Sequence, residues 1–220
     1  GGVENALNMP SLSAEQAPKL KPYMALATQL GSLVGQLAAD QIKGVAVEVE
    51  GAAAELDQKP ITAAVLAGLM RAYSDTVNMV NAPYLAKERG LDVREIRHER
   101  EGDYHTLVRV SVTTDEGEKS VAGTLFGSSG PRLVGIKVEA DMEGDMLYIV
   151  NRDEPGFIGR VGSTLGEAGV NIGTFHLGRR SDAPGGEAVL LLSIDSPVEE
   201  PVLWSVCQLE GVKTVKALKF

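Results

Sequence analysis

The chain has 220 residues, 44% of them hydrophobic and 23% charged, which fits a globular protein of one large domain or two small ones. Its net charge of -9 opposes binding to phosphate backbones, so nucleic acid is not an expected partner. The lone Cys207 excludes an internal disulfide and cannot by itself build a zinc or iron–sulfur site. No apolar run could span a bilayer and no signal peptide is recognisable, so we expect a cytoplasmic protein without a membrane partner.

The N-terminal part is predicted to connect this chain to the rest of a longer protein. It starts Gly1-Gly2-Val3 without an initiator Met, and we interpret the chain as a fragment of a longer protein. Ser13 and Gln16 have the spacing of a capping box. A helix is then expected to extend to residue 40, because leucines and a valine recur at helical spacing: Leu26, Leu30, Leu33, Val34 and Leu37. Residues 1–40 are therefore predicted as a connecting segment with one helix.

Residues 41–142 are predicted to form a first domain, a mixed β-sheet with flanking helices. Valines alternate with other residues in 44–51, which is the period of a strand. A helix is predicted over residues 60–80, with a proline at its tolerated first turn. Asn81-Ala82-Pro83 then breaks it before a short helix that ends at Arg89. Further strands are expected at residues 91–97, 106–113, 119–126 and 132–139, the second and third joined as a hairpin.

Residues 143–220 are predicted to form a second domain. Apolar patterns and turn residues give the order strand, helix, strand, strand, helix, strand, at residues 147–150, 156–167, 170–179, 188–195, 198–208 and 212–219. This order is the βαββαβ arrangement of a ferredoxin-like fold. The chain is therefore predicted to be an α+β protein of two domains.

A candidate ligand site lies where the first strand of this second domain meets its first helix. The helix start at Pro155 leaves backbone N–H groups that could hold a ligand carboxylate, those of Gly156, Phe157 and Ile158. Asp153 could accept a ligand ammonium group, and Asn151 and Asn171 offer both donors and acceptors. The pattern predicts a site for a small zwitterion. In the simpler alternative, which the bare sequence favours, Asp153 only caps the helix.

The rest of the sequence offers few candidate functional residues. Arg132 follows the Gly/Ser-rich segment 123–131 and could hold an anion, although a solvated hairpin explains the same residues. Glu48 and Glu50 alternate with valines, which is typical of a solvated strand face. The histidines lack the spacing of metal ligands, and no phosphate-binding or nucleophile motif is present. We therefore predict no catalytic residue, cofactor or metal in this part of the protein.

Several motifs, in order along the whole chain, resemble the C-terminal regulatory region of long D-3-phosphoglycerate dehydrogenases. Asn8-Met9-Pro10-Ser11 resembles the segment after their catalytic core. Val80-Asn81-Ala82-Pro83 and Gly123-Thr124-Leu125-Phe126-Gly127 resemble their intervening, allosteric substrate-binding domain. The turn at 151–156 with Gly169-Val170-Asn171-Ile172 resembles the ACT domain, a ligand-sensing module.

The resemblance implies a parent enzyme that oxidises 3-phosphoglycerate with NAD at the first step of L-serine biosynthesis. It implies that L-serine binds between two ACT domains through Asn151, Asp153 and Asn171. Relatives often carry a larger His or Tyr at the position of Asn151, so a weaker serine response is expected. In the intervening domain, Arg132 is implied as a ligand of a phosphate-bearing or other anionic effector.

The same resemblance implies a homo-oligomer, because ACT domains commonly pair between subunits as dimers or tetramers. Serine bound between two copies would reach the catalytic part through the helix at residues 12–40. Two alternatives remain open from the residues. One is a free-standing amino-acid-sensing ACT protein. The other is the regulatory part of an iron–sulfur serine dehydratase, which the single cysteine opposes.

Overall fold

The computed structural model describes residues 17–38, 42–98, 105–125, 131–134, 142–180 and 185–220, with the backbone alone described for 131–134. The chain forms two compact units, Gly1–Leu133 and Val134–Phe220. Residues 135–141 lie outside the described parts, so the boundary predicted between residues 142 and 143 stays a prediction. Within the described residues, no helix has the length and apolar character needed to cross a bilayer.

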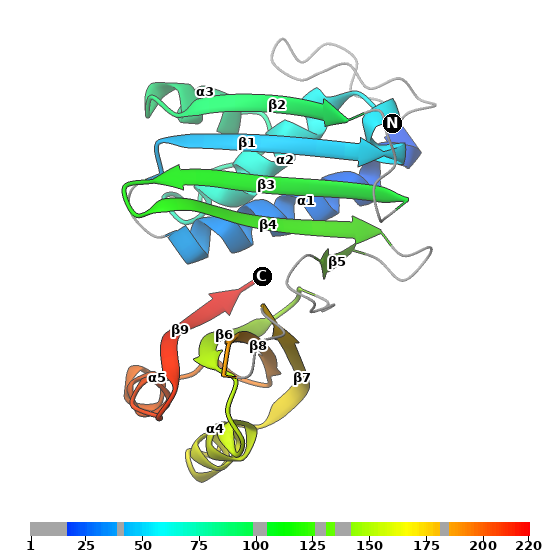
Figure 1. Cartoon of the computed structure of the whole chain (residues 1–220). Coiled ribbons are helices and arrows are strands. Elements are labelled where there is room, and N and C mark those ends of the chain that lie inside the picture. Colours follow the sequence, from blue (N-terminus) through cyan, green and yellow to red (C-terminus); the bar gives the residue numbers. More distant parts are fainter. Residues whose placement is uncertain (1–16, 39–41, 99–104, 126–130, 135–141, 181–184) are drawn as a thin grey trace. The chain divides into compact units, whose positions relative to one another are not determined.

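The first unit is a five-stranded mixed sheet in the order β2-β1-β3-β4-β5. β1 and β2 are parallel, whereas β3 runs antiparallel to both β1 and β4. The helices α1 and α2 cover one face of this sheet (Figure 1). The elements of this unit are α1 (Ala17–Ala38), β1 (Gly44–Gly51), α2 (Gln58–Met70), α3 (Ala82–Glu88), β2 (Asp92–His98), β3 (Thr106–Thr114), β4 (Gly117–Leu125) and β5 (Pro131–Val134).

Helices α1 and α2 touch through their backbones. A Cβ atom on Gly31 would lie 2.1 Å from the carbonyl oxygen of Val65, and one on Gly68 would lie 2.0 Å from that of Thr28. Only glycine allows so close an approach. On either side of this crossing, leucines such as Leu26 and Leu33 are buried, so the two helices form the core layer behind the sheet.

The helix predicted over residues 60–80 is shorter than expected. Asp57 caps α2 by accepting a hydrogen bond from Lys59 N at 3.1 Å, so the helix begins earlier, at Gln58. It ends at Met70, and Asn78 Oδ1 then accepts the N–H groups of Val80 and Asn81 at 2.8 and 3.1 Å. A side chain that satisfies backbone donors competes with helix formation. The predicted helical segment 71–80 is therefore wrong.

Other boundaries differ by a few residues. The strand predicted at 132–139 is described only as Pro131–Val134, and the capping residues Ser13 and Gln16 lie outside the described residues. The hairpin between β3 and β4 is present, with Thr114 opposite Gly117.

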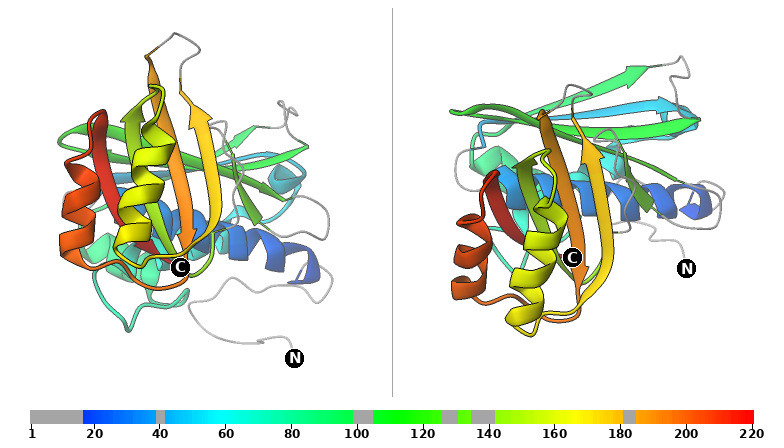
Figure 2. Two further views of the ribbon diagram at one scale, coloured as in Figure 1. Left: turned by 90° about the horizontal axis from the view of Figure 1, so that it is seen from below. Right: turned by 60° about the horizontal axis from the view of Figure 1, so that its bottom comes forward.

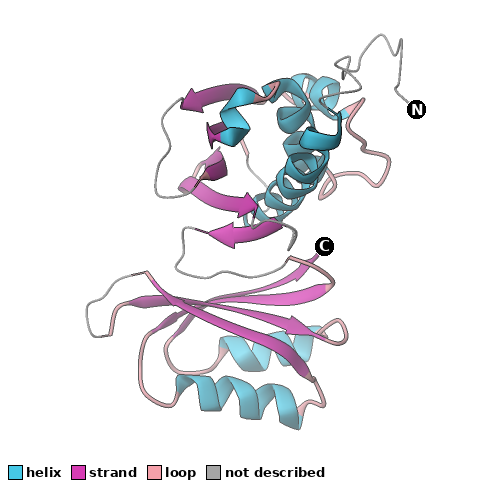
Figure 3. Cartoon of the chain, turned by 90° about the vertical axis from the view of Figure 1, so that its right-hand side faces the viewer, coloured by secondary structure: helices cyan, strands magenta, loops and turns pink. Residues whose placement is uncertain are grey.

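The second unit has the predicted βαββαβ order. Its elements are β6 (Asp145–Arg152), α4 (Phe157–Glu167), β7 (Ile172–Arg179), β8 (Glu187–Ile194), α5 (Glu200–Cys207) and β9 (Val212–Lys219). The strands pair antiparallel in the order β7-β8-β6-β9. Both helices lie on one face of the sheet, as Figures 2 and 3 show. The α+β prediction is thus confirmed for both units.

The core of this unit lies between the sheet and its two helices. Leu147 and Ile149 of β6 pack with Leu190 and Leu192 of β8, and all four are fully buried. From α4, apolar side chains complete the cluster at helical spacing: Phe157, Val161 and Leu165. This packing fixes the direction of α4, and hence the place where its N-terminus meets the end of β6.

Candidate functional site

The turn from β6 into α4 is held by backbone bonds to two other segments. Arg152 N–H donates to Gly211 O and Asp153 N–H to Gly186 O, both at 2.8 Å. Gly156 is the N-cap residue of α4 and adopts a left-handed conformation, with φ of 83°. No side chain of the described residues caps this helix. The turn is therefore tied to two other segments of the unit, and the positive end of the helix dipole faces the pocket described next.

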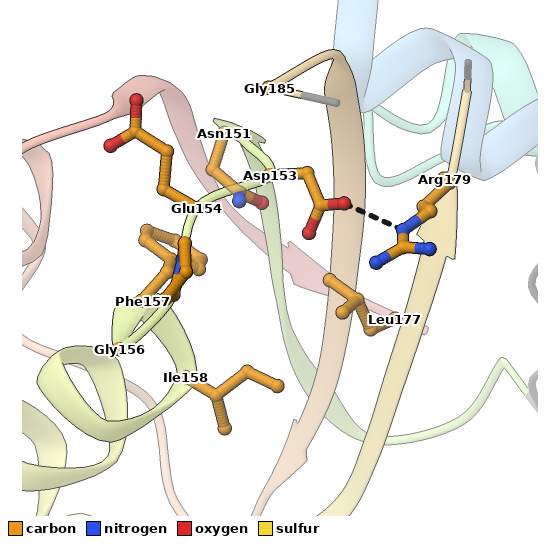
Figure 4. A pocket seen from close by; sticks show the side chains of 10 residues that line it. Asn151, Asp153, Glu154, Gly156, Phe157, Ile158, Leu177, Arg179 and Gly185 are labelled. Carbon is orange, nitrogen blue, oxygen red and sulfur yellow. Dashed lines mark hydrogen bonds and ion pairs between the residues drawn. The ribbon is translucent and has the colours of Figure 1, made fainter. Parts of the chain in front are cut away.

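An open pocket of about 540 Å³ lies at this turn. Its lining residues are Asn151, Asp153, Glu154, Pro155, Gly156, Phe157, Ile158, Leu177, Arg179 and Gly185, and Figure 4 shows them from close by. Six of the seven residues predicted for the ligand site are in this set; Asn171 is not. One wall is apolar, because Ile158 from α4 and Leu177 from β7 expose 50% and 36% of their surface.

The carboxylate of Asp153 is held by a cation. Arg179 Nε donates to Asp153 Oδ2 at 2.6 Å, the contact drawn as a dashed line in Figure 4. The alternative in which Asp153 caps α4 is wrong, because the N-cap position belongs to Gly156 and no side chain serves it. Asp153 instead contributes negative charge to the pocket wall.

Asn151 presents an unused acceptor. The residue is only 1% exposed, and its Nδ2 donates to Arg152 O at 2.7 Å. This bond fixes the amide orientation and leaves Oδ1 buried, without a hydrogen-bond partner among the described residues. A buried acceptor without a partner costs about 1–3 kcal/mol. A ligand donor in the pocket would remove that cost.

Asn171 lies at the other end of the unit. Its Nδ2 donates to Asp195 Oδ2 at 2.6 Å, beside the start of β7. Asn151 and Asp153 lie at the opposite end of β6. The length of this strand separates them from Asn171, about 25 Å for eight residues. One copy of the chain therefore cannot bring all three predicted residues around one small ligand.

Sequence reasoning missed Arg179 and Leu177. The register explains why they reach the pocket, because Asn151 and Arg179 both pair with Ala188, from opposite sides of β8. Arg179 is 26 residues from Asp153 in the chain. The strand order of a ferredoxin-like fold was the signal that could have placed it.

In the first unit the predicted anion ligand, Arg132, lies in β5, where side chains are outside the described residues. The face of β1 carries a mixed cluster instead. Glu48 Oε2 lies 3.3 Å from His98 Nε2 and 3.5 Å from Arg109 Nη1. Glu48, Glu50 and His98 place one ligand atom each within 4.8 Å of one another. The guanidinium of Arg109 already compensates Glu48, which opposes a cation there.

The two units define an α+β protein in which a mixed-sheet domain precedes a ferredoxin-like domain with a pocket at its first turn. Residues 19–137 match the model of the D-3-phosphoglycerate dehydrogenase intervening domain, and residues 146–210 match the ACT domain. The chain belongs to the D-3-phosphoglycerate dehydrogenase family and corresponds to its regulatory region. The match of the intervening domain opposes the alternative of a free-standing ACT protein.

Curated relatives agree with this assignment. A D-3-phosphoglycerate dehydrogenase of Bacillus subtilis (strain 168) is 35% identical over 220 residues, covering 98% of this chain and 42% of the relative. Those of Synechocystis and Methanocaldococcus jannaschii are each 34% identical, covering 99% and 98% of this chain and 40% and 41% of the relatives. The chain thus spans about two-fifths of the length of these relatives.

Proposed function

We propose that this chain is the serine-sensing regulatory part of an NAD-dependent D-3-phosphoglycerate dehydrogenase. The parent enzyme would oxidise 3-phosphoglycerate at the first step of L-serine biosynthesis, in the cytoplasm. NAD and the catalytic residues would belong to the remaining part of the relatives' length. The family match and the pocket at the first turn of the ACT domain support this function.

The binding mode follows from the polarity of the pocket. The carboxylate of L-serine would approach the start of α4, near the predicted residues Gly156, Phe157 and Ile158, where the helix dipole favours an anion. The N–H of Phe157 already donates to Glu154 O at 3.3 Å, so the proposed donors are the N–H groups of Gly156 and Ile158. Its ammonium group would bind Asp153 and Asn151 Oδ1. The observation that carries this proposal is the buried Oδ1 of Asn151, which has no hydrogen-bond partner among the described residues.

Two copies are needed to bring Asn171 to the same ligand. If β7 and α4 of two copies meet about a two-fold axis, the start of β7 in one copy lies near the end of β6 in the other. Both β7 and β9 are edge strands of the sheet. β9 carries Lys213, Lys216 and Lys219, and lysines on an edge oppose strand pairing, which favours β7 as the joined edge. A dimer or a tetramer would follow.

An anionic or phosphorylated effector of the intervening domain remains part of the proposal, with Arg132 as its expected ligand. Serine bound at the ACT domains would shift the orientation of the subunits. Allosteric coupling of this kind typically amounts to about 1–3 kcal/mol.

Calorimetric titration with L-serine tests the sensing function. The wild-type chain should bind serine, and Asp153→Ala should lose binding with less than about 1 kcal/mol of lost stability, because its partner Arg179 is an exposed side chain. Glu116→Ala is a matched control that removes an exposed carboxylate paired with Lys119 in the other unit. Absence of heat and of thermal stabilisation at millimolar serine would refute the proposal.

A further inference from the structure

One oxygen of the Asp153 carboxylate, the group proposed to bind the ligand ammonium, already pairs with a cation of the same chain. Arg179 Nε lies 2.6 Å from Asp153 Oδ2, at the edge of the pocket (Figure 4). The side chain of Asp153 is 21% exposed and that of Arg179 is 62% exposed. The carboxylate is thus fixed in the wall, while the guanidinium is largely in solvent and can move away from it.

The remaining groups of the pocket indicate which charge of a zwitterion meets this pair. The start of α4, which no side chain of the described residues caps, is the place where an anion is favoured. Asn151 Oδ1 is an acceptor and needs a donor. A ligand that places its carboxylate at the helix therefore directs its ammonium toward Asn151 and Asp153, where Arg179 now lies.

We propose that Arg179 is an internal competitor that occupies the ammonium position on Asp153 and leaves it when an amino acid binds. This inference rests on the proposed function and names a residue that sets the affinity of the site. Arg179 is a positioning residue of the pocket, because it acts on the ligand through Asp153.

The size of the effect follows from the exposure of the pair. Exposed ion pairs contribute little, so removing the competitor should tighten binding by about two- to fivefold. The gain should be confined to ligands with an ammonium group, because only these compete for the carboxylate of Asp153. Arg179 would thereby lower the affinity of the site for an amino acid, and the pocket would stay open.

The test compares Arg179→Met with Arg180→Met by calorimetric titration of the 220-residue chain. Arg180 is the adjacent residue and loses the same charge, but it contacts Tyr148 Oη at 3.1 Å and Glu187 Oε2 at 3.4 Å instead of Asp153. Arg179→Met should bind L-serine about two- to fivefold more tightly than wild type, whereas Arg180→Met should bind like wild type. L-glycerate, which has a hydroxyl group in place of the ammonium group of L-serine, should gain nothing.

The remaining outcomes distinguish failure of the competitor role from failure of serine sensing. Weaker or unchanged serine binding by Arg179→Met, with wild-type binding intact, overturns the competitor role and leaves serine sensing standing. Equal tightening by both variants overturns it as well, because a change in overall charge would then be the cause. Absence of serine binding by the wild-type chain, with or without binding by Arg179→Met, refutes the sensing function and the competitor role that rests on it. Thermal unfolding checks each variant, with Arg179→Gln as the substitute if the Met variant unfolds.

Discussion

At the scale of single residues, the first turn of the ACT domain combines one fixed and one unsatisfied polar group. Asp153 forms an ion pair with Arg179, whereas Asn151 Oδ1 is buried without a partner among the described residues. A buried acceptor of this kind lowers stability unless a ligand satisfies it. The buried acceptor therefore lowers the stability of the unit, which is typical of a ligand-binding site.

Replacing Asn151 with Ala separates its effect on stability from its effect on serine binding. The variant loses the donor to Arg152 O, and with it about 1 kcal/mol, but it also loses the unsatisfied acceptor, so its net stability should change by less than about 1 kcal/mol. Serine affinity should fall by about ten- to a hundredfold, because a hydrogen bond from a charged ammonium is lost. Urea unfolding and calorimetry measure the two effects. Unchanged serine affinity would show that Oδ1 is not a ligand.

At the scale of elements, α1 and α2 pack through their backbones. Gly31 and Gly68 allow a backbone approach that no other residue type could fit, because the clashing atoms are backbone carbonyl oxygens. A backbone atom cannot rotate away as a side chain can. The crossing therefore fixes where the helix layer lies on the sheet of the intervening domain.

Gly31→Ala should therefore destabilise the intervening domain by about 1–3 kcal/mol or more, because the two helices must move apart. Gly35→Ala, one turn along the same helix, is the matched control: its Cβ atom would lie 3.0 Å from Leu69 O, compared with 2.1 Å from Val65 O at Gly31. We expect a clearly smaller loss for Gly35→Ala, measured as the shift in thermal unfolding. Equal losses would indicate that helix propensity, rather than the crossing, limits stability.

At the scale of the whole molecule, one copy of the chain places the predicted serine ligands at opposite ends of the ACT sheet. Asn171 lies by Asp195, at the end of the sheet away from Asp153. A two-fold arrangement would combine Asp153 of one copy with Asn171 of the other, at each of two sites. Serine binding and self-association would then be one event.

Mixing two inactive variants tests this arrangement. Asp153→Ala and Asn171→Ala should each abolish serine binding, because each variant alone spoils both sites of its dimer. In a mixed dimer one site carries both changes and the other carries neither, so random mixing should restore about a quarter of the sites. Calorimetric titration with serine, after the two variants are refolded together, measures the fraction of restored sites. No recovery, with mixed dimers shown to form, would contradict a site shared between copies.

Some features were determined by the sequence alone. The alternation of apolar residues predicted the order βαββαβ and the α+β class, because burial on one face imposes the same period wherever the strand lies. The helix start near Pro155 and the polar turn before it were predicted for the same local reason. The prediction from local pattern failed at residues 71–80, because α2 ends at Met70 and Asn78 Oδ1 further along accepts backbone N–H groups.

Only the tertiary structure decided what the polar turn contacts. The ion pair between Asp153 and Arg179 depends on β8 lying between β6 and β7, and the separation of Asn171 from Asp153 depends on the direction of β7. Strand order and direction are long-range properties, so no local pattern carries them. The sequence thus predicted six of the residues that line the pocket, and the fold added Leu177 and Arg179 and placed Asn171 elsewhere.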